Sequence, residues 1–234
     1  MDAIDAARAV VREEHADARA AFLGGSVMTD RRTTTSDLDI VVVLHGAPAP
    51  YRASVRRHGW PVELFVHTED TWHAFVEREV RSRRSPLLFM CAEGLLLFDT
   101  DGVGARLAAE ARTISAAGPA PVPAAEIDDI RYAITYLLDD LSGCTDDIER
   151  LFIRTELARR TAELALATSG SWNGGGKWLA RRVEAAAPGL GPRLHEGVRH
   201  ALAGHAESLI GVVDQVLDQA GGRLWAGYRR SGTP

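Results

Sequence analysis

Hydrophobic residues follow two different spacings along this chain. In residues 3–20, apolar side chains recur at helical spacing with charged residues between them, which predicts an amphipathic opening helix. Residues 22–23 then run into two glycines, as at the end of a short strand. Residues 37–44 and 62–66 are rich in β-branched residues and are bounded by glycine or proline, and residues 95–98 end in a turn sequence. The first half therefore predicts a small sheet.

Helical patterns accompany these strands and then take over. Residues 69–83 and 103–114 have helical spacing. Residues 116–123 carry three prolines and a glycine, which favours a linker. Beyond it the periodic segments are helical, over 127–141, 146–168 and 192–219. We expect an α+β protein, with a mixed β-sheet and flanking helices in residues 1–118 and a helical bundle in residues 119–234.

Composition narrows the class of protein. Hydrophobic residues make up 46% and charged residues 25%, which excludes a disordered or fibrous chain. The formal net charge of −5 gives no general attraction to nucleic acid, so RNA binding would need a local basic patch, and arginines 78, 81, 83 and 84 form one. Cys91 and Cys144 lack zinc or redox spacing. No signal peptide or membrane-length apolar run is visible, which predicts a cytoplasmic protein.

Two aspartates carry the strongest chemical signal. Asp37 and Asp39 are one residue apart on a predicted strand, whose period of two puts both side chains on one face. Glu63 lies between apolar residues on the next predicted strand. Carboxylate oxygens are the ligands that Mg²⁺ prefers, and phosphoryl transfer needs its negative charge neutralised. Taken singly, the alternative interpretations are a loop cap for Asp37, a solvated position on an edge strand for Asp39 and an arginine partner for Glu63.

A glycine-serine turn precedes the aspartates and favours the functional interpretation. Gly24 and Gly25 allow close backbone approach, and a helical turn starting at Ser26 would direct backbone N–H groups at a phosphate. Gly25-Ser26, ten intervening residues and Asp37-Leu38-Asp39 resemble the signature of the DNA polymerase β-type nucleotidyltransferase superfamily. The resemblance implies that Ser26 contacts a triphosphate and that Asp37, Asp39 and Glu63 bind magnesium. It covers residues 20–70.

The second half resembles the helical part of the aminoglycoside adenylyltransferases. In the branch that modifies streptomycin and spectinomycin, an acidic residue opens a helix, an arginine follows about three turns later, and a lysine follows a glycine-containing loop. Glu149, Arg159 and Lys177 stand in that order here. The resemblance implies an acid that binds the acceptor and two cations that bind the triphosphate. From the sequence, Asp146 and Asp147 compete with Glu149, and Arg160 competes with Arg159.

These observations predict an enzyme that transfers a nucleoside monophosphate, AMP from ATP being the first choice, to a hydroxyl of a small molecule. Glu63 and Glu149 are the candidate general bases. The acidic residues between 139 and 149 would suit a polycationic acceptor such as an aminoglycoside antibiotic. Two alternatives stay open: transfer to protein or RNA, and a catalytically silent, antitoxin-like nucleotide-binding module. The antitoxin assignment is disfavoured because Val27-Met28-Thr29-Asp30 replaces the basic residue and glycine usual after the turn.

Overall fold

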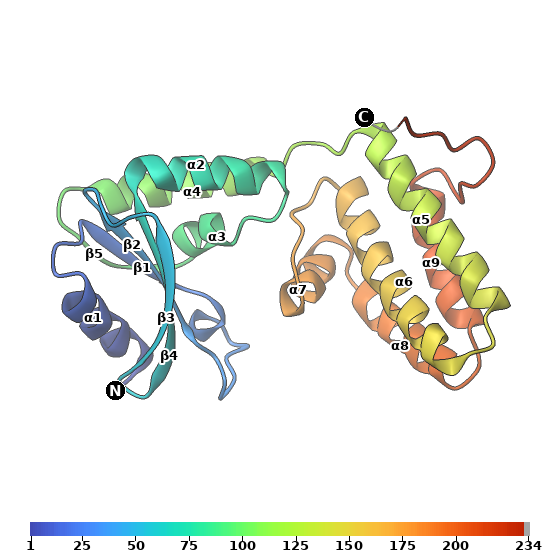
Figure 1. The fold of residues 1–234 in the computed structure, drawn as a ribbon, viewed down its shortest axis with the longest axis horizontal. Coiled ribbons are helices and arrows are strands. Elements are labelled where there is room, and N and C mark those ends of the chain that lie inside the picture. The colour runs from blue at the N-terminus through green and yellow to red at the C-terminus, as the bar shows by residue number, and fades with distance from the viewer. Residues whose placement is uncertain (232–234) are drawn as a thin grey trace. The chain divides into compact units, whose positions relative to one another are not determined.

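The computed structural model describes residues 1–231 and divides the chain into two compact units, Met1–Pro119 and Ala120–Pro234. Figure 1 labels the helices and strands of both units. The first is a mixed α+β unit and the second is helical, so the fold class expected from the sequence is confirmed.

The first unit is built on a five-stranded sheet in the order β3-β4-β2-β1-β5. Its strands are β1 (Ala20–Gly24), β2 (Leu38–Leu44), β3 (Tyr51–Arg57), β4 (Trp60–Thr68) and β5 (Leu95–Asp99). Strands β2 and β4 pair in parallel, whereas the other neighbours pair antiparallel. The predicted strand at 62–66 is longer than expected, and β3 is a strand that the sequence did not predict.

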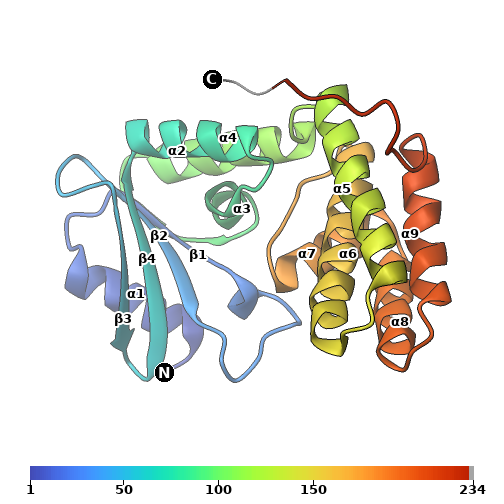
Figure 2. The ribbon, with the colours of Figure 1, turned by 45° about the vertical axis from the view of Figure 1, so that its right-hand side comes forward.

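Helices cover both faces of this sheet. Helix α1 (Ala3–Glu14) lies on one face, and α2 (Glu69–Arg81), α3 (Pro86–Ala92) and α4 (Val103–Ala117) lie on the other (Figures 1 and 2). A short 3₁₀ helix, η1 (Ser26–Met28), follows β1. The opening helix is shorter than the expected 3–20, and α3 was not predicted. It begins with Pro86, where the missing N–H costs no helical hydrogen bond.

Strand β2 has buried apolar side chains on both of its faces and an acidic side chain near its start. Its alternate residues Leu38, Ile40 and Val42 are buried in the cluster that includes α1. The residues between them, Val41 and Val43, are also fully buried, and these point to the opposite face. A strand covered on both sides reads as a continuous apolar run, as this sequence does. Asp39 lies near the N-terminal end of β2, on the same face as Val41 and Val43.

The second unit consists of five helices among the residues described. They are α5 (Ala124–Gly143), α6 (Asp147–Thr168), α7 (Lys177–Ala186), α8 (Leu190–Leu202) and α9 (Glu207–Gln219). The buried side chains Ile134, Leu138 and Leu157 belong to one core shared by these helices. The single helix expected over 192–219 is wrong: α8 ends before Gly204, whose φ of 95° does not continue a helix. Over residues 1–231, no helix is long and apolar enough to cross a bilayer.

Candidate active site

The glycine-serine turn forms one wall of the site. Strand β1 ends at Gly24, and Gly25 follows with φ 79° and ψ −171°, a conformation that is almost restricted to glycine. A Cβ atom at Gly25 would lie 2.0 Å from Oδ2 of Asp39. Ser26 begins η1, and its buried hydroxyl lies 3.1 Å from the hydroxyl of Ser36. The turn therefore passes directly beside the carboxylate of Asp39, and glycine is required for that approach.

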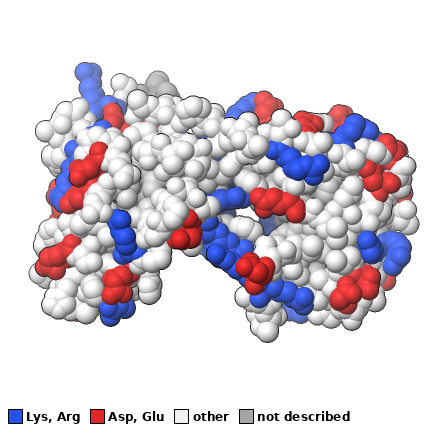
Figure 3. All heavy atoms as spheres, turned by 180° about the vertical axis from the view of Figure 1, so that it is seen from behind, with Lys and Arg blue, Asp and Glu red and all other residues white. Residues whose placement is uncertain are grey.

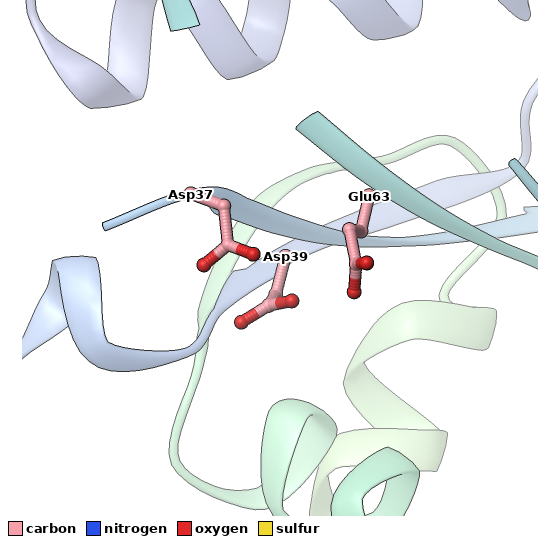
Figure 4. A group of neighbouring side chains, drawn as sticks. All are labelled: Asp37, Asp39 and Glu63. Carbon is pink, nitrogen blue, oxygen red and sulfur yellow. The ribbon is translucent and has the colours of Figure 1, made fainter. Parts of the chain in front are cut away.

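Three carboxylates converge beside this turn. Asp39 and Glu63 are register partners in the parallel pair of β2 and β4, so their side chains leave the same face. Asp37 immediately precedes β2 and shares that face. One oxygen from each of the three lies within 4.8 Å of the others, and all three side chains are partly buried. Figure 4 shows them pointing to the same side, toward one another.

An arginine that the sequence interpretation missed contacts this group. Arg52 on β3 forms an ion pair with Oε2 of Glu63. Its guanidinium also lies 4.6 Å from the ring centroid of Phe65. The alternative that Glu63 pairs with an arginine is therefore what the structure shows, and it coexists with the carboxylate cluster. Oε1 of Glu63 takes no part in that ion pair, so one oxygen stays available to a ligand.

The donor set fits a hard divalent cation. Oxygen ligands around Mg²⁺ at about 2.0–2.1 Å lie about 3–4 Å from one another, so modest side-chain rotations would bring these three carboxylates around one ion. Three negative charges this close repel one another, and Arg52 offsets only part of that charge. A cation between Asp37, Asp39 and Glu63 would remove the repulsion.

The acids predicted in the second unit lie at the start of α6. Asp146 caps this helix, because Oδ1 accepts hydrogen bonds of 2.9 Å from the backbone N–H groups of Ile148 and Glu149. Glu149 lies in the first helical turn and accepts a contact of 3.3 Å from the thiol of Cys144. Asp146 thus has a structural role, whereas Glu149 and Asp147 are exposed in the same turn. Their binding of an acceptor stays a prediction.

The predicted cations of the second unit have different environments. Arg159 forms 2.6 Å ion pairs with Glu156 and Glu163, and Arg160 also pairs with Glu156. Hydrogen bonds from Arg159 and then from Arg160 lower the pKa of Glu156 to about 2. Lys177 is the first residue of α7, directly after Gly176. A phosphate would have to compete with two carboxylates for Arg159.

The arginine patch on α2 is partly neutralised. Arg81 pairs with Glu77, and Arg78 lies 4.1 Å above the ring of Phe75. Acidic and basic side chains are intermixed over the face of the molecule in Figure 3. The helix patch therefore offers less free positive charge to a nucleic acid than the sequence suggests.

Comparisons with known proteins find a match in structure but none in sequence. A scan against protein-family models finds no match, and a search of curated proteins finds none either. Among solved structures, the chain is similar to a nucleotidyltransferase-like protein from Exiguobacterium sibiricum 255-15. Identity is 11% and the TM-score is 0.44, over 93% of this chain and 77% of the other. The carboxylates and their turn, and not this likeness, carry the function proposed for the chain.

Proposed function

We propose that this chain is a magnesium-dependent nucleotidyltransferase that moves a nucleoside monophosphate from a triphosphate, ATP being the first candidate, to a hydroxyl of a small molecule. One observation carries the proposal: Asp37, Asp39 and Glu63 meet within 4.8 Å beside a turn that only glycine can form. Phosphoryl transfer depends on positioning and on charge neutralisation, and a cation held by these carboxylates would supply both.

The reaction can be written with its bonds balanced. The acceptor oxygen forms a bond to the α-phosphorus, the bond from that phosphorus to the bridging oxygen of the β-phosphate breaks, and pyrophosphate leaves. The hydroxyl proton passes to a carboxylate, for which Glu63 and Glu149 are the candidates. Magnesium, when bound, neutralises phosphate charge and draws the reacting groups together.

The residues of the first unit have distinct roles in this proposal. Asp37 and Asp39 hold the cation, and Gly25 lets a phosphate approach the backbone beside Ser26. Glu63 presents one oxygen to the cation or to the proton while Arg52 holds the other. Arg52 thereby fixes the side chain of Glu63 in the orientation that faces the aspartates.

The second unit is proposed to supply positive charge to the leaving pyrophosphate through Lys177 and Arg159. Lys177 follows a glycine-rich loop, at the start of α7. Arg159 is engaged by Glu156 and Glu163, so a phosphate would have to displace these carboxylates to bind it. Aminoglycoside antibiotics stay among the acceptors to be tested, since the acidic residues near the start of α6 suit a polycation.

Label transfer and metal binding together test the proposal. The protein is incubated with α-³²P-labelled ATP and magnesium, with separate pools of aminoglycosides, sugar phosphates, RNA and protein. Binding of Mn²⁺ is measured in parallel by electron paramagnetic resonance. We expect Asp37→Asn and Asp39→Asn to lose transfer and to weaken Mn²⁺ binding at least about tenfold. The control Asp17→Asn, an exposed acid after α1, should behave as wild type.

The outcomes separate the alternatives. Transfer to RNA or protein in place of small molecules would favour the macromolecular transferase. An absence of both transfer and magnesium-dependent ATP binding would favour a silent module. Full activity and unchanged Mn²⁺ binding in both aspartate variants would overturn the metal assignment.

A further inference from the structure

The face of the sheet that carries the carboxylates continues onto an edge strand with basic residues. In the antiparallel pair of β3 and β4, Ser54 is the register partner of Glu63, and Arg56 is the partner of Pro61. Register partners point to the same side, so Arg52, Ser54 and Arg56 share the face of Asp39 and Glu63. All three β3 residues are exposed. This basic row, Arg52, Ser54 and Arg56, therefore lies open beside the carboxylates.

A pocket of about 500 Å³ adjoins the same end of the sheet. Its lining includes Arg32, Thr33, Thr34, Ser36, Trp60 and Pro61. Ser36 immediately precedes Asp37 and Pro61 lies two residues before Glu63, whereas Trp60 packs against the apolar cluster on the opposite face, which α1 covers. The guanidinium of Arg32 lies 4.8 Å from the ring centroid of Trp60, which holds a positive charge at the wall of the pocket. A volume of this size suits a small molecule and not a long polymer.

The charges of this surface select the class of ligand. None of the described residues that line the pocket is acidic. On the adjoining edge strand the exposed charged residues of the row are Arg52 and Arg56. In the proposed function the three carboxylates of this face hold the cation or accept the proton, and Glu63 is also bound to Arg52. A polycation would have to compete with the cation for these carboxylates, while an anion beside the row would meet the exposed Arg56.

We propose that the acceptor is a small hydroxylated molecule bearing a phosphate group, held by the basic row. The inference rests on the proposed function, and it specifies the substrate class for that site. Two strand spacings, about 10 Å, separate β3 from β2. This separation lets a sugar-phosphate-sized molecule place its hydroxyl at the cation and its phosphate at the edge. Arginine suits that role because its planar donors match phosphate oxygens.

Matched acceptor pairs test this substrate class. Glucose 6-phosphate, ribose 5-phosphate and glycerol 3-phosphate are compared with glucose, ribose and glycerol, and with kanamycin, in the transfer of label from α-³²P-labelled ATP with magnesium. We expect labelling of at least one phosphorylated member and at least about tenfold less of its unphosphorylated partner. Preferential labelling of kanamycin or of an unphosphorylated sugar would overturn the inference.

Variants of the basic row locate the phosphate. For the labelled acceptor, Arg56→Ala should raise KM about tenfold and Arg56→Glu more, with kcat and the KM for ATP close to wild type, and Arg56→Lys should recover part of the loss. The control is Arg8→Ala, an exposed arginine on α1, which covers the opposite face. Equal KM values for Arg56→Glu and Arg8→Ala would overturn the assignment of the phosphate to this row.

A binding measurement without turnover separates the two proposals. Isothermal titration of the metal-free protein with the phosphorylated acceptor should show binding that Arg56→Glu weakens and that Asp37→Asn preserves. If magnesium-dependent ATP binding is intact but no phosphorylated acceptor binds or is labelled, the substrate class is wrong and the proposed function stands. If magnesium-dependent ATP binding is missing, both proposals fail.

Discussion

Replacement of Gly25 by alanine is the sharpest perturbation of the candidate site. Two separate effects follow from the geometry. Any residue with a side chain is strained at φ 79° and ψ −171°, at a cost of roughly 1–3 kcal/mol. The added Cβ would also lie 2.0 Å from Oδ2 of Asp39, where ordinary contact begins near 3.4 Å. The carboxylate of Asp39 must therefore retreat by more than about 1 Å, and a displacement of that size costs about 100-fold in rate when it affects a positioned reacting group.

Gly102→Ala separates strain from displacement. Gly102 has φ 81°, and the atom nearest to an added Cβ there would be 3.7 Å away, on Arg106, which is ordinary contact. Both variants should lose free energy of unfolding, about 1 kcal/mol for Gly102→Ala and somewhat more for Gly25→Ala, measured by urea titration. Only Gly25→Ala should lose Mn²⁺ affinity and nucleotidyl transfer. If Gly25→Ala retained both within about twofold of Gly102→Ala, the placement of Asp39 against the turn would be wrong.

Three further expectations concern the rest of the molecule. Burial lowers the pKa of His67 to about 4 from its ordinary value of 6.5, so the unfolded chain binds the extra proton first. Stability should fall by up to about 3 kcal/mol as the pH drops from about 6.5 to about 4, and His67→Gln should flatten that slope in urea titrations; an unchanged slope would exclude His67 as its source. Burial raises the pKa of the Cys91 thiol to about 12, so a thiol reagent should label Cys144 in the native protein and Cys91 only after denaturation, and rapid native labelling of both would contradict that burial. The ring centroids of Trp225 and Tyr132 lie 5.4 Å apart in a stacked arrangement, so Trp225→Ala should lower the free energy of unfolding by about 1–2 kcal/mol and the melting temperature with it. An unchanged melting temperature would show that the stack contributes nothing.

The sequence predicted the parts of the site that depend on local pattern. A β-branched run with acids at its start predicted β2 and the shared face of Asp37 and Asp39. The glycines before Ser26 predicted a tight turn, and η1 begins there. Glu63 was predicted as the third acid of the group from its place between apolar residues on a strand. These features are visible because period and turn chemistry are properties of a few consecutive residues.

The missed features depend on pairing between distant segments. Strand β3 has arginine or serine at each exposed position, so its pattern of apolar and polar residues is a weak signal for a strand. It forms a strand because it pairs with β4. Arg52 was missed with it, because its contact with Glu63 joins two strands. Glu156 and Glu163 lie three and four residues from Arg159 on one helix, so these ion pairs were visible in the sequence. They weaken the prediction that Arg159 binds the triphosphate. The break at Gly204 also had a sequence signal, the glycine itself.

The parallel pairing of β2 with β4 protects the site against errors in strand alignment. Asp39 stands opposite Glu63 only in the native register, and Val62 and Leu64 beside it point into the apolar core. A slip by one residue would turn Glu63 into that core and Val62 and Leu64 to the carboxylate face, at a cost comparable with the net stability of a domain. A sheet with the native strand register therefore also brings the three carboxylates together, so the pairing that stabilises the fold assembles the proposed metal-binding group.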